Sequence, residues 1–239
     1  MIIEVLYPEL CNLYGDAMNA EYLYRAVPES ELIKTSLKSR PAFIDKTVDF
    51  IYLGSMTEEG QTLAIEALKQ YHKKLLELIE NKTLILATGN AMELFGTHIE
   101  NEDGSFIEAL NIFNLHSKRQ MMNRYSSIYL GTFEAIDIVG FKSQFAHIYD
   151  NDNKDTPALF ETIRGAGRKP GEKEEGARIN NFIATSVLGP LLILNPPFTR
   201  YLLSLLNVHS CALPYENEIL TAYNARLSEF KDPKTGVEY

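Results

Sequence analysis

Two apolar runs, separated by one long amphipathic segment, restrict what this chain can fold into. The runs are VDFIYLG at residues 48–54 and TLILAT at residues 83–88, and both are typical of buried β-strands. Between them, apolar residues recur at helical spacing and predict a helix of about five or six turns, at Leu63, Ala67, Leu68, Tyr71, Leu75 and Leu78. A strand, a helix and a strand in this order form a crossover unit, so we expect an α/β fold with a parallel sheet.

The flanking segments extend this pattern. Residues 2–8 and 181–189 are further strand candidates, and helical patterns occupy residues 16–27, 195–206 and 215–230. The pattern changes at residues 105–149 to short β-rich pieces, which favour antiparallel strands set against the parallel part.

Residues 163–180 concentrate glycine and charge, and this composition predicts a solvent-exposed loop. The loop carries a cluster of basic residues in an otherwise acidic chain, namely Arg164, Arg168, Lys169 and Lys173. Solvated side chains are the simpler interpretation of this cluster, and contact with an anion or a partner is the alternative.

Composition restricts the class of protein further. The chain has 239 residues, 45% of them hydrophobic and 23% charged, and we expect one domain over residues 1–239. Its net charge of −9 argues against a nucleic-acid partner. Cys11 and Cys211 have no metal-binding spacing, so we expect no metal site, no cofactor and a reducing, cytoplasmic location.

A membrane location is not expected. The longest apolar stretch, at about residues 182–194, is interrupted by Gly189 and Pro190 and is too short to cross a bilayer. The N-terminal residues also lack the basic and apolar regions of a signal peptide.

The segment LILATGNAMELFG at residues 84–96 is a strand followed by a sharp turn and a short amphipathic helix. In many α/β enzymes such a turn holds the nucleophile, because a side chain there is exposed at the end of the sheet beside the N-terminus of a helix. In this chain the corresponding residue is Gly89, which has no side chain to react.

Five motifs follow one another along the chain: NLYGD at 12–16, YLGSMTEEGQ at 52–61, LATGNAMELFG at 86–96, GF at 140–141 and ATSVLGPLL at 184–192. Their order and spacing resemble the class I glutamine amidotransferases of the cobyric acid synthase (CobB/CobQ) type, a branch that includes the glutaminase subunit of lipid II isoglutaminyl synthase. The resemblance covers about residues 10–205. It implies a flavodoxin-like three-layer sandwich with a central, mostly parallel sheet and a smaller antiparallel sheet.

The resemblance also implies a chemistry, in which a cysteine on the turn attacks glutamine, a histidine transfers the proton, and the ammonia passes to a partner synthetase. The cysteine would fall at Gly89 and the histidine at Leu188, and the oxyanion loop would lie at Gly54, Ser55 and Met56. Glycine and leucine cannot attack a carboxamide or carry its proton. Since losing either member of such a pair costs a factor on the order of 10⁶, we expect no glutaminase activity.

The remaining candidate residues each have a structural and a functional interpretation. Gly89 either relaxes the turn or opens a pocket, and Leu188 belongs either to the core or to a pocket wall. For Thr88 and for either cysteine, the sequence favours a packing role over that of a substitute nucleophile. None of the five histidines lies on the strand at 184–190: His72, His98, His116, His147 and His209.

On the resemblance, the ligand-contacting candidates are Gly54, Ser55, Asn90, Glu93 and Arg124. Glu93 lies where the family carries a substrate-contacting glutamine, so its carboxylate is a candidate for a cationic ligand, and the alternative is that it complements the helix dipole. Arg124 lies near the arginine that holds the glutamine carboxylate in related subunits, and the alternative is a surface salt bridge.

Three functions remain open. The first is a catalytically degenerate subunit that docks on or regulates a synthetase, either Mur-ligase-like or from a cobalamin-like pathway. The second is an enzyme that uses a different nucleophile on the same scaffold, such as Thr88, Ser55, Glu93 or a cysteine. The third is a module that binds a small metabolite without reaction.

Overall fold

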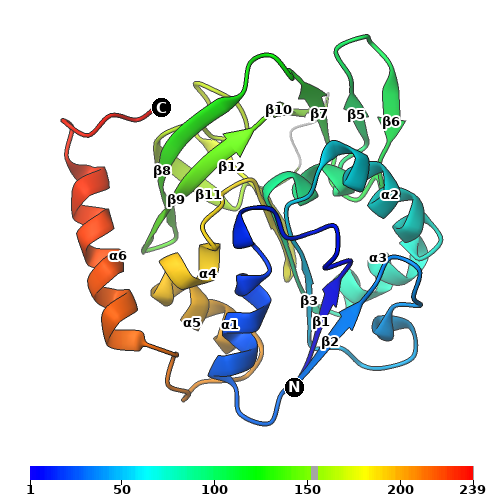
Figure 1. The fold of residues 1–239 in the computed structure, drawn as a ribbon, viewed down its shortest axis with the longest axis horizontal. Coiled ribbons are helices and arrows are strands. Elements are labelled where there is room, and N and C mark those ends of the chain that lie inside the picture. Colours follow the sequence, from blue (N-terminus) through cyan, green and yellow to red (C-terminus); the bar gives the residue numbers. More distant parts are fainter. Residues whose placement is uncertain (152–155, 239) are drawn as a thin grey trace.

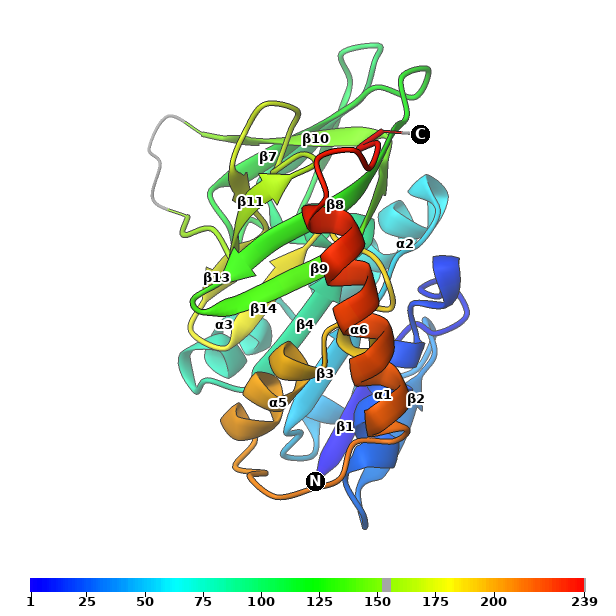
Figure 2. The ribbon, with the colours of Figure 1, turned by 90° about the vertical axis from the view of Figure 1, so that its left-hand side faces the viewer.

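The computed structural model describes residues 1–151 and 156–238, and a six-stranded sheet forms its centre (Figures 1 and 2). The strands lie in the order β13-β14-β4-β3-β1-β2, and all neighbours are parallel except β13 and β14. Their bounds are β1 (Ile2–Leu6), β2 (Glu31–Thr35), β3 (Phe50–Leu53), β4 (Leu84–Thr88), β13 (Ala177–Ile179) and β14 (Phe182–Thr185). The parallel sheet predicted from the crossover unit is therefore confirmed.

Helices cover both faces of this sheet. One face packs against α2 (Glu58–Lys69) and α3 (His72–Glu80), and the other against α1 (Met18–Ala26), α4 (Leu191–Leu194) and α5 (Pro196–Leu205) (Figure 1). The three layers agree with the expected sandwich. The single helix expected between β3 and β4 is wrong, because the chain turns at Tyr71, whose ring packs edge-on against Phe43 with ring centroids 5.9 Å apart.

Two small four-stranded sheets lie above the central sheet, where the resemblance implied one. The first is antiparallel, in the order β12-β11-β8-β9, with β8 (Tyr125–Phe133), β9 (Ile136–Gln144), β11 (Phe160–Arg164) and β12 (Glu174–Glu175). The second has the order β10-β7-β5-β6 and one parallel pair, with β5 (His98–Glu100), β6 (Phe106–Glu108), β7 (Leu115–Arg119) and β10 (Ala146–Asp150).

The remaining elements connect these layers. Three short 3₁₀ helices are η1 (Leu13–Gly15), η2 (Ala42–Ile44) and η3 (Gly89–Phe95), and the last of these follows β4 directly. The C-terminal helix α6 (Glu216–Lys231) packs against the β8–β9 hairpin through Tyr223 and Phe230 (Figure 2). Within the described residues, no helix is long and apolar enough to cross a membrane.

The segment at 163–180 is not the exposed loop that its composition predicted. Arg168 is fully buried, and its guanidinium donates to Asp150 at 2.9 Å and to the carbonyl of Gly176 at 3.0 Å. Arg164 donates to backbone carbonyls near the C-terminus, among them that of Asp232 at 2.7 Å. Of the four basic residues in this segment, only Lys173 is largely exposed as expected, and Lys169 is partly buried in a pair with Glu172. The charges were visible in the sequence, but their partners come from distant strands.

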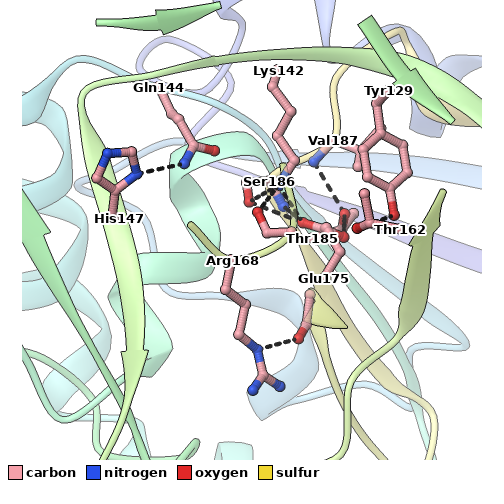
Figure 3. Close-up of polar contacts among 12 residues, drawn as sticks. Tyr129, Lys142, Gln144, His147, Thr162, Arg168, Glu175, Thr185, Ser186 and Val187 are labelled. Atoms are coloured by element: carbon pink, nitrogen blue, oxygen red, sulfur yellow. Dashed lines mark hydrogen bonds and ion pairs between the residues drawn. The ribbon is translucent and has the colours of Figure 1, made fainter. Parts of the chain in front are cut away.

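A buried ion pair joins the antiparallel sheet to the segment after β14 (Figure 3). The ammonium of Lys142 on β9 lies 3.0 Å from the carboxylate of Glu175, and both side chains are fully buried. Lys142 also donates to the hydroxyl of Ser186 at 3.0 Å, and Glu175 accepts from the backbone N–H and the hydroxyl of Ser186. Burial lowers the pKa of Lys142, and the charge of Glu175 opposes this shift. The pair therefore fixes the backbone that leads to Leu188.

Replacing Lys142 should be costly, because the carboxylate of Glu175 would remain buried without a cation. We expect Lys142→Met to lower the free energy of unfolding by about 3–5 kcal/mol, measured by urea denaturation. The matched control is Lys118→Met, which removes an exposed pair with Glu100 and should cost much less, because solvent screens that pair. Equal losses in the two variants would show that the buried pair has no special structural role.

Candidate functional site

The turn after β4 is closed to any side chain at residue 89. Gly89 has a φ of +61°, a left-handed conformation that glycine adopts readily. A Cβ placed on it would lie 2.0 Å from Oγ of Ser55 and 2.9 Å from Cδ2 of Leu188. The hydroxyl of Ser55 therefore occupies the space in which a side chain at residue 89 would begin.

A buried carboxylate holds Ser55 in this position. Both the backbone N–H and the hydroxyl of Ser55 donate to Oδ2 of Asp16, at 3.1 and 2.9 Å. The hydroxyl of Thr88 donates to the same oxygen at 2.5 Å, so three donors converge on one atom. Burial raises the pKa of Asp16, while these hydrogen bonds oppose the shift. Thr88 is thus buried and hydrogen-bonded to a carboxylate, a partner that the expected packing role did not include.

Tyr52 completes this polar cluster beneath the turn. Its hydroxyl donates to the backbone carbonyl of Asp16 at 2.7 Å and lies 2.7 Å from the hydroxyl of Thr88. The side chain of Asn19 in α1 donates to Oδ1 of Asp16 and to the Tyr52 hydroxyl. The cluster therefore links η1, β3, β4 and α1 directly below the turn.

Leu188 faces Gly89 from the other side, and its side chain is buried. Its backbone forms an antiparallel bridge with Phe141 on β9, with N–O distances of 3.0 and 2.8 Å. Within the described residues, neither cysteine thiol is hydrogen-bonded to an imidazole. Burial raises the pKa of the Cys11 thiol to about 12, which keeps it protonated, and Cys211 packs among the apolar residues of the α1 and α5 side.

A hollow of about 100 Å³ opens beside the turn. Five predicted site residues line it, namely Ser55, Met56, Asn90, Glu93 and Leu188. Gly54 does not, because its backbone packs against Cys11, where a Cβ would lie 2.7 Å from the Cys11 carbonyl oxygen. None of the five histidines, all of which the structure describes, lines the hollow.

Arg124 lies in a neighbouring hollow of about 250 Å³, which shares Tyr14, Ser143 and Leu188 with the first. Its guanidinium donates to the Ser143 hydroxyl and lies 5.7 Å from the centre of the Phe145 ring. Among the described residues it forms no salt bridge. Among these residues the expected surface salt bridge is not seen, and a contact between Arg124 and a ligand remains a prediction.

Asn90 and Glu93 have different surroundings within η3. The Asn90 amide accepts from the N–H of Met56 at 2.9 Å and donates to its carbonyl at 2.7 Å, which ties the loop after β3 to the turn. Glu93 is buried, and its Oε2 accepts from Gln61 at 3.1 Å. Burial raises the pKa of Glu93 to about 7. Glu93 also lies beyond the first turn of η3, whereas the helix-dipole interpretation placed it in the first turn.

Four residues that shape the site are not among the residues predicted from the sequence: Asp16, Gln61, Arg119 and Gln144. Asp16 and Gln61 lie inside quoted motifs, so a search for polar residues in those motifs could have found them. Arg119 comes from β7 and Gln144 from β9. Nothing local in the sequence marks these two, because folding alone brings their strands to the turn. Within the described residues, no cluster of three or more metal-ligating side chains is present.

Comparisons with known proteins agree with this arrangement. The model of the CobB/CobQ-like glutamine amidotransferase domain family matches residues 2–193. The chain is 25% identical over 199 residues to the glutamine-hydrolyzing subunit GatD of lipid II isoglutaminyl synthase from Staphylococcus aureus (strain N315). That similarity covers 80% of this chain and 78% of the relative.

Solved structures support the same fold. A crystal structure of a glutamine amidotransferase superimposes with a TM-score of 0.58 at 14% identity, covering 87% of this chain and all of that one. A glutamine amidotransferase from Thermotoga maritima gives a TM-score of 0.51 at 7% identity, covering 97% of this chain and 90% of that one. At these identities the likeness concerns the fold alone.

The contact between Ser55 and residue 89 predicts an unusual cost for Gly89→Ala. Left-handed backbone at alanine costs about 1–2 kcal/mol by itself, and the clash with the Ser55 hydroxyl should add to this. Gly15→Ala is the matched control, because Gly15 has a φ of +71° and a Cβ placed on it would meet no atom within 4 Å. We expect Gly89→Ala to lose at least about 1 kcal/mol more than Gly15→Ala in urea denaturation. Equal losses would mean that Ser55 does not restrict the turn.

The raised pKa of Glu93 predicts that the stability of the fold depends on pH. Its pKa in the folded chain is about 7 rather than the ordinary 4.5, so protonation favours the folded state. The free energy of unfolding therefore decreases as the pH rises from about 4.5 to about 7, and Glu93 accounts for up to about 3 kcal/mol of this decrease.

Glu93→Gln should remove that part of the dependence. The stability of the variant relative to the unmodified chain should thus increase between pH 5 and pH 8, as measured by urea denaturation at each pH. Glu59→Gln, at a more accessible position in the first turn of α2, serves as the control and should give no such increase. Parallel stability curves for Glu93→Gln and the unmodified chain would contradict the prediction.

Proposed function

The chain belongs to the CobB/CobQ-like glutamine amidotransferase family, and on that premise we propose that it is a member without glutaminase activity that docks on or regulates a synthetase. The observation that carries the proposal is the filled turn, where the Ser55 hydroxyl lies 2.0 Å from the position of a Cβ on Gly89. Hydrolysis of a carboxamide by a cysteine needs a thiolate and an imidazole. At the two corresponding places this chain has glycine and leucine.

The scaffold around the turn supports a role in an assembly. The family match extends over residues 2–193, and the S. aureus relative is by name a subunit of a synthase. Leu13 and Tyr14 line the hollow and are 38% and 54% exposed, so a partner that covers the hollow could contact both side chains. We therefore propose a Mur-ligase-like synthetase as the partner, with a cobalamin-pathway synthetase as the alternative.

A second candidate, an enzyme with a different nucleophile, has one specific observation in its favour. The Ser55 hydroxyl lines the hollow and lies 2.9 Å from the carboxylate of Asp16, which is within reach of a general base. Two features weigh against it: Ser55 is only 2% exposed, and Asp16 is already shared among three donors. We therefore rank this candidate below the non-hydrolytic subunit.

The proposal is tested by measuring the glutamate released from glutamine, for the purified chain alone and for the chain co-expressed with a Mur-ligase-like synthetase. We expect no release above the uncatalysed rate in either case, because the missing pair accounts for a factor on the order of 10⁶. We also expect the two proteins to co-purify. Release that Ser55→Ala abolishes would contradict the proposal and favour the second candidate, and failure to co-purify with any synthetase would contradict the docking role.

A further inference from the structure

The outward face of the sheet β10-β7-β5-β6 carries a row of aromatic rings (Figure 1). Ile99 and Ser117 are paired in register and buried, so they face the interior. Because side chains alternate along a strand, the preceding residues His98 and His116 lie on the opposite face, together with Tyr149, which pairs with His116. All three rings are partly exposed, and none of them lines the hollow beside the turn.

Two of these rings are stacked face to face. The imidazoles of His98 and His116 have centroids 4.9 Å apart and an angle of 9° between their planes. The ring of Tyr149 continues the stack at 5.5 Å from that of His116. The ammonium groups of Lys118 and Lys169 lie 5.8 and 4.8 Å from the centre of the Tyr149 ring. Basic and titratable groups therefore gather around the imidazole pair, in a chain whose net charge is −9.

Hydrogen bonds fix which nitrogen of each imidazole is free. The Thr97 hydroxyl donates to the carbonyl of Leu115, so its oxygen accepts from Nδ1 of His98 at 3.0 Å. The amide oxygen of Asn151 accepts from Nδ1 of His116 at 2.8 Å. Within the described residues neither Nε2 has a hydrogen-bond partner, and neither is buried. Both rings therefore present Nε2 to solvent in a fixed orientation.

The stacked geometry favours an anion over a metal ion. A metal ion lies in the plane of each imidazole that binds it, at about 2.0 Å, so two parallel rings 4.9 Å apart cannot share one ion. When protonated, each ring instead carries an Nε2–H, and two parallel donors at this spacing can reach two oxygens of one anion. The two imidazolium charges also repel each other, and a bound anion would remove that repulsion.

We propose that His98 and His116 form a binding site for a tetrahedral oxyanion, either a free ion such as sulfate or the phosphate group of a larger molecule. Each imidazolium donates one hydrogen bond to the anion, and two positive charges match a dianion. Lys118 and Lys169 add positive charge at the rim. The inference goes beyond the proposed function and does not depend on it, because the site lies on another face of the chain.

Carboxylates beside the pair set the conditions for binding. Glu100 forms an ion pair with Lys118 at 2.8 Å, and Glu172 forms one with Lys169 at 2.8 Å. Glu108 lies on β6 directly opposite the first imidazole and forms no ion pair within the described residues. These three carboxylates oppose an anion while the imidazoles are neutral, so binding requires protonation of the pair.

Binding should therefore weaken as the pH rises. Burial lowers the pKa of His98, the charges of His116 and Lys118 add to this shift, and the charge of Glu100 opposes it. His147, the third histidine of this sheet, is buried and its pKa is also lowered by burial, so it adds less charge. An imidazole of ordinary pKa is about nine-tenths charged at pH 5.5 and about one thirtieth charged at pH 8. We expect sulfate to bind at least about tenfold more tightly at pH 5.5 than at pH 8.

The test is an NMR titration of the full chain with sodium sulfate at pH 5.5, followed on the Cε1–H signals of the histidines, with sodium chloride at equal ionic strength as the control. Sulfate is a dianion throughout this pH range, so a change in affinity reports on the protein. We expect saturable shifts at His98 and His116 but not at His209, an exposed histidine after α5. His98→Gln and His116→Gln should each weaken binding by about fivefold or more, and the matched control His209→Gln should leave it unchanged. Glu108→Gln, which removes the unpaired carboxylate, should tighten binding.

Equal shifts with sulfate and chloride, or shifts at His209 as large as those at the pair, would show screening by salt alone and would overturn the proposal. Unchanged binding in both His98→Gln and His116→Gln, with circular dichroism showing folded variants, would overturn it as well. Inorganic phosphate and methyl phosphate at pH 5.5 then distinguish the source of the anion. Binding of both supports a phosphate ester as ligand, and binding of the inorganic ion alone supports a free ion.

Discussion

The hydrogen bond between the Ser55 hydroxyl and the Asp16 carboxylate is the contact on which the site depends. It holds the hydroxyl in the space next to Gly89 where a side chain would otherwise begin. Thr88 donates a hydrogen bond to this carboxylate, and Tyr52 donates one to the backbone carbonyl of Asp16. The arrangement is therefore anchored in the central sheet. The absence of a side chain at residue 89 is therefore built into the packing of the turn and involves more than one residue.

Each sheet of the fold supplies a different part of the site around this turn. The end of β4, and Gly89 directly after it, lie at the carboxyl edge of the parallel sheet, which is where ligand sites of such sheets lie. The two small sheets supply the walls of the hollow, with Arg119 from β7 and Gln144 from β9. The buried pair of Lys142 and Glu175 fixes the segment that carries Leu188 against the turn. A hollow thus persists beside a turn that has no reactive side chain.

Sequence reasoning reached the central sheet because its signals are local, such as the buried runs that became β3 and β4. From the order of the motifs, it also aligned Gly89 and Leu188 with the family's cysteine and histidine. The structure brings these two residues together at the turn. It failed at the segment around Arg168, where composition indicated solvent and folding supplied partners from β10 and β12. Arg119 and Gln144 escaped for the same reason, since long-range strand pairing carries no local signature.

The most direct test of the account uses 6-diazo-5-oxo-L-norleucine, a glutamine analogue that alkylates the nucleophile of a glutaminase. The full chain is incubated with an excess of this reagent and its intact mass is measured. If the turn is filled by Ser55 and lacks a reactive group, the mass stays unchanged. A covalent adduct on Ser55, Thr88, Glu93 or either cysteine would show that the hollow still holds a working nucleophile and would contradict the account.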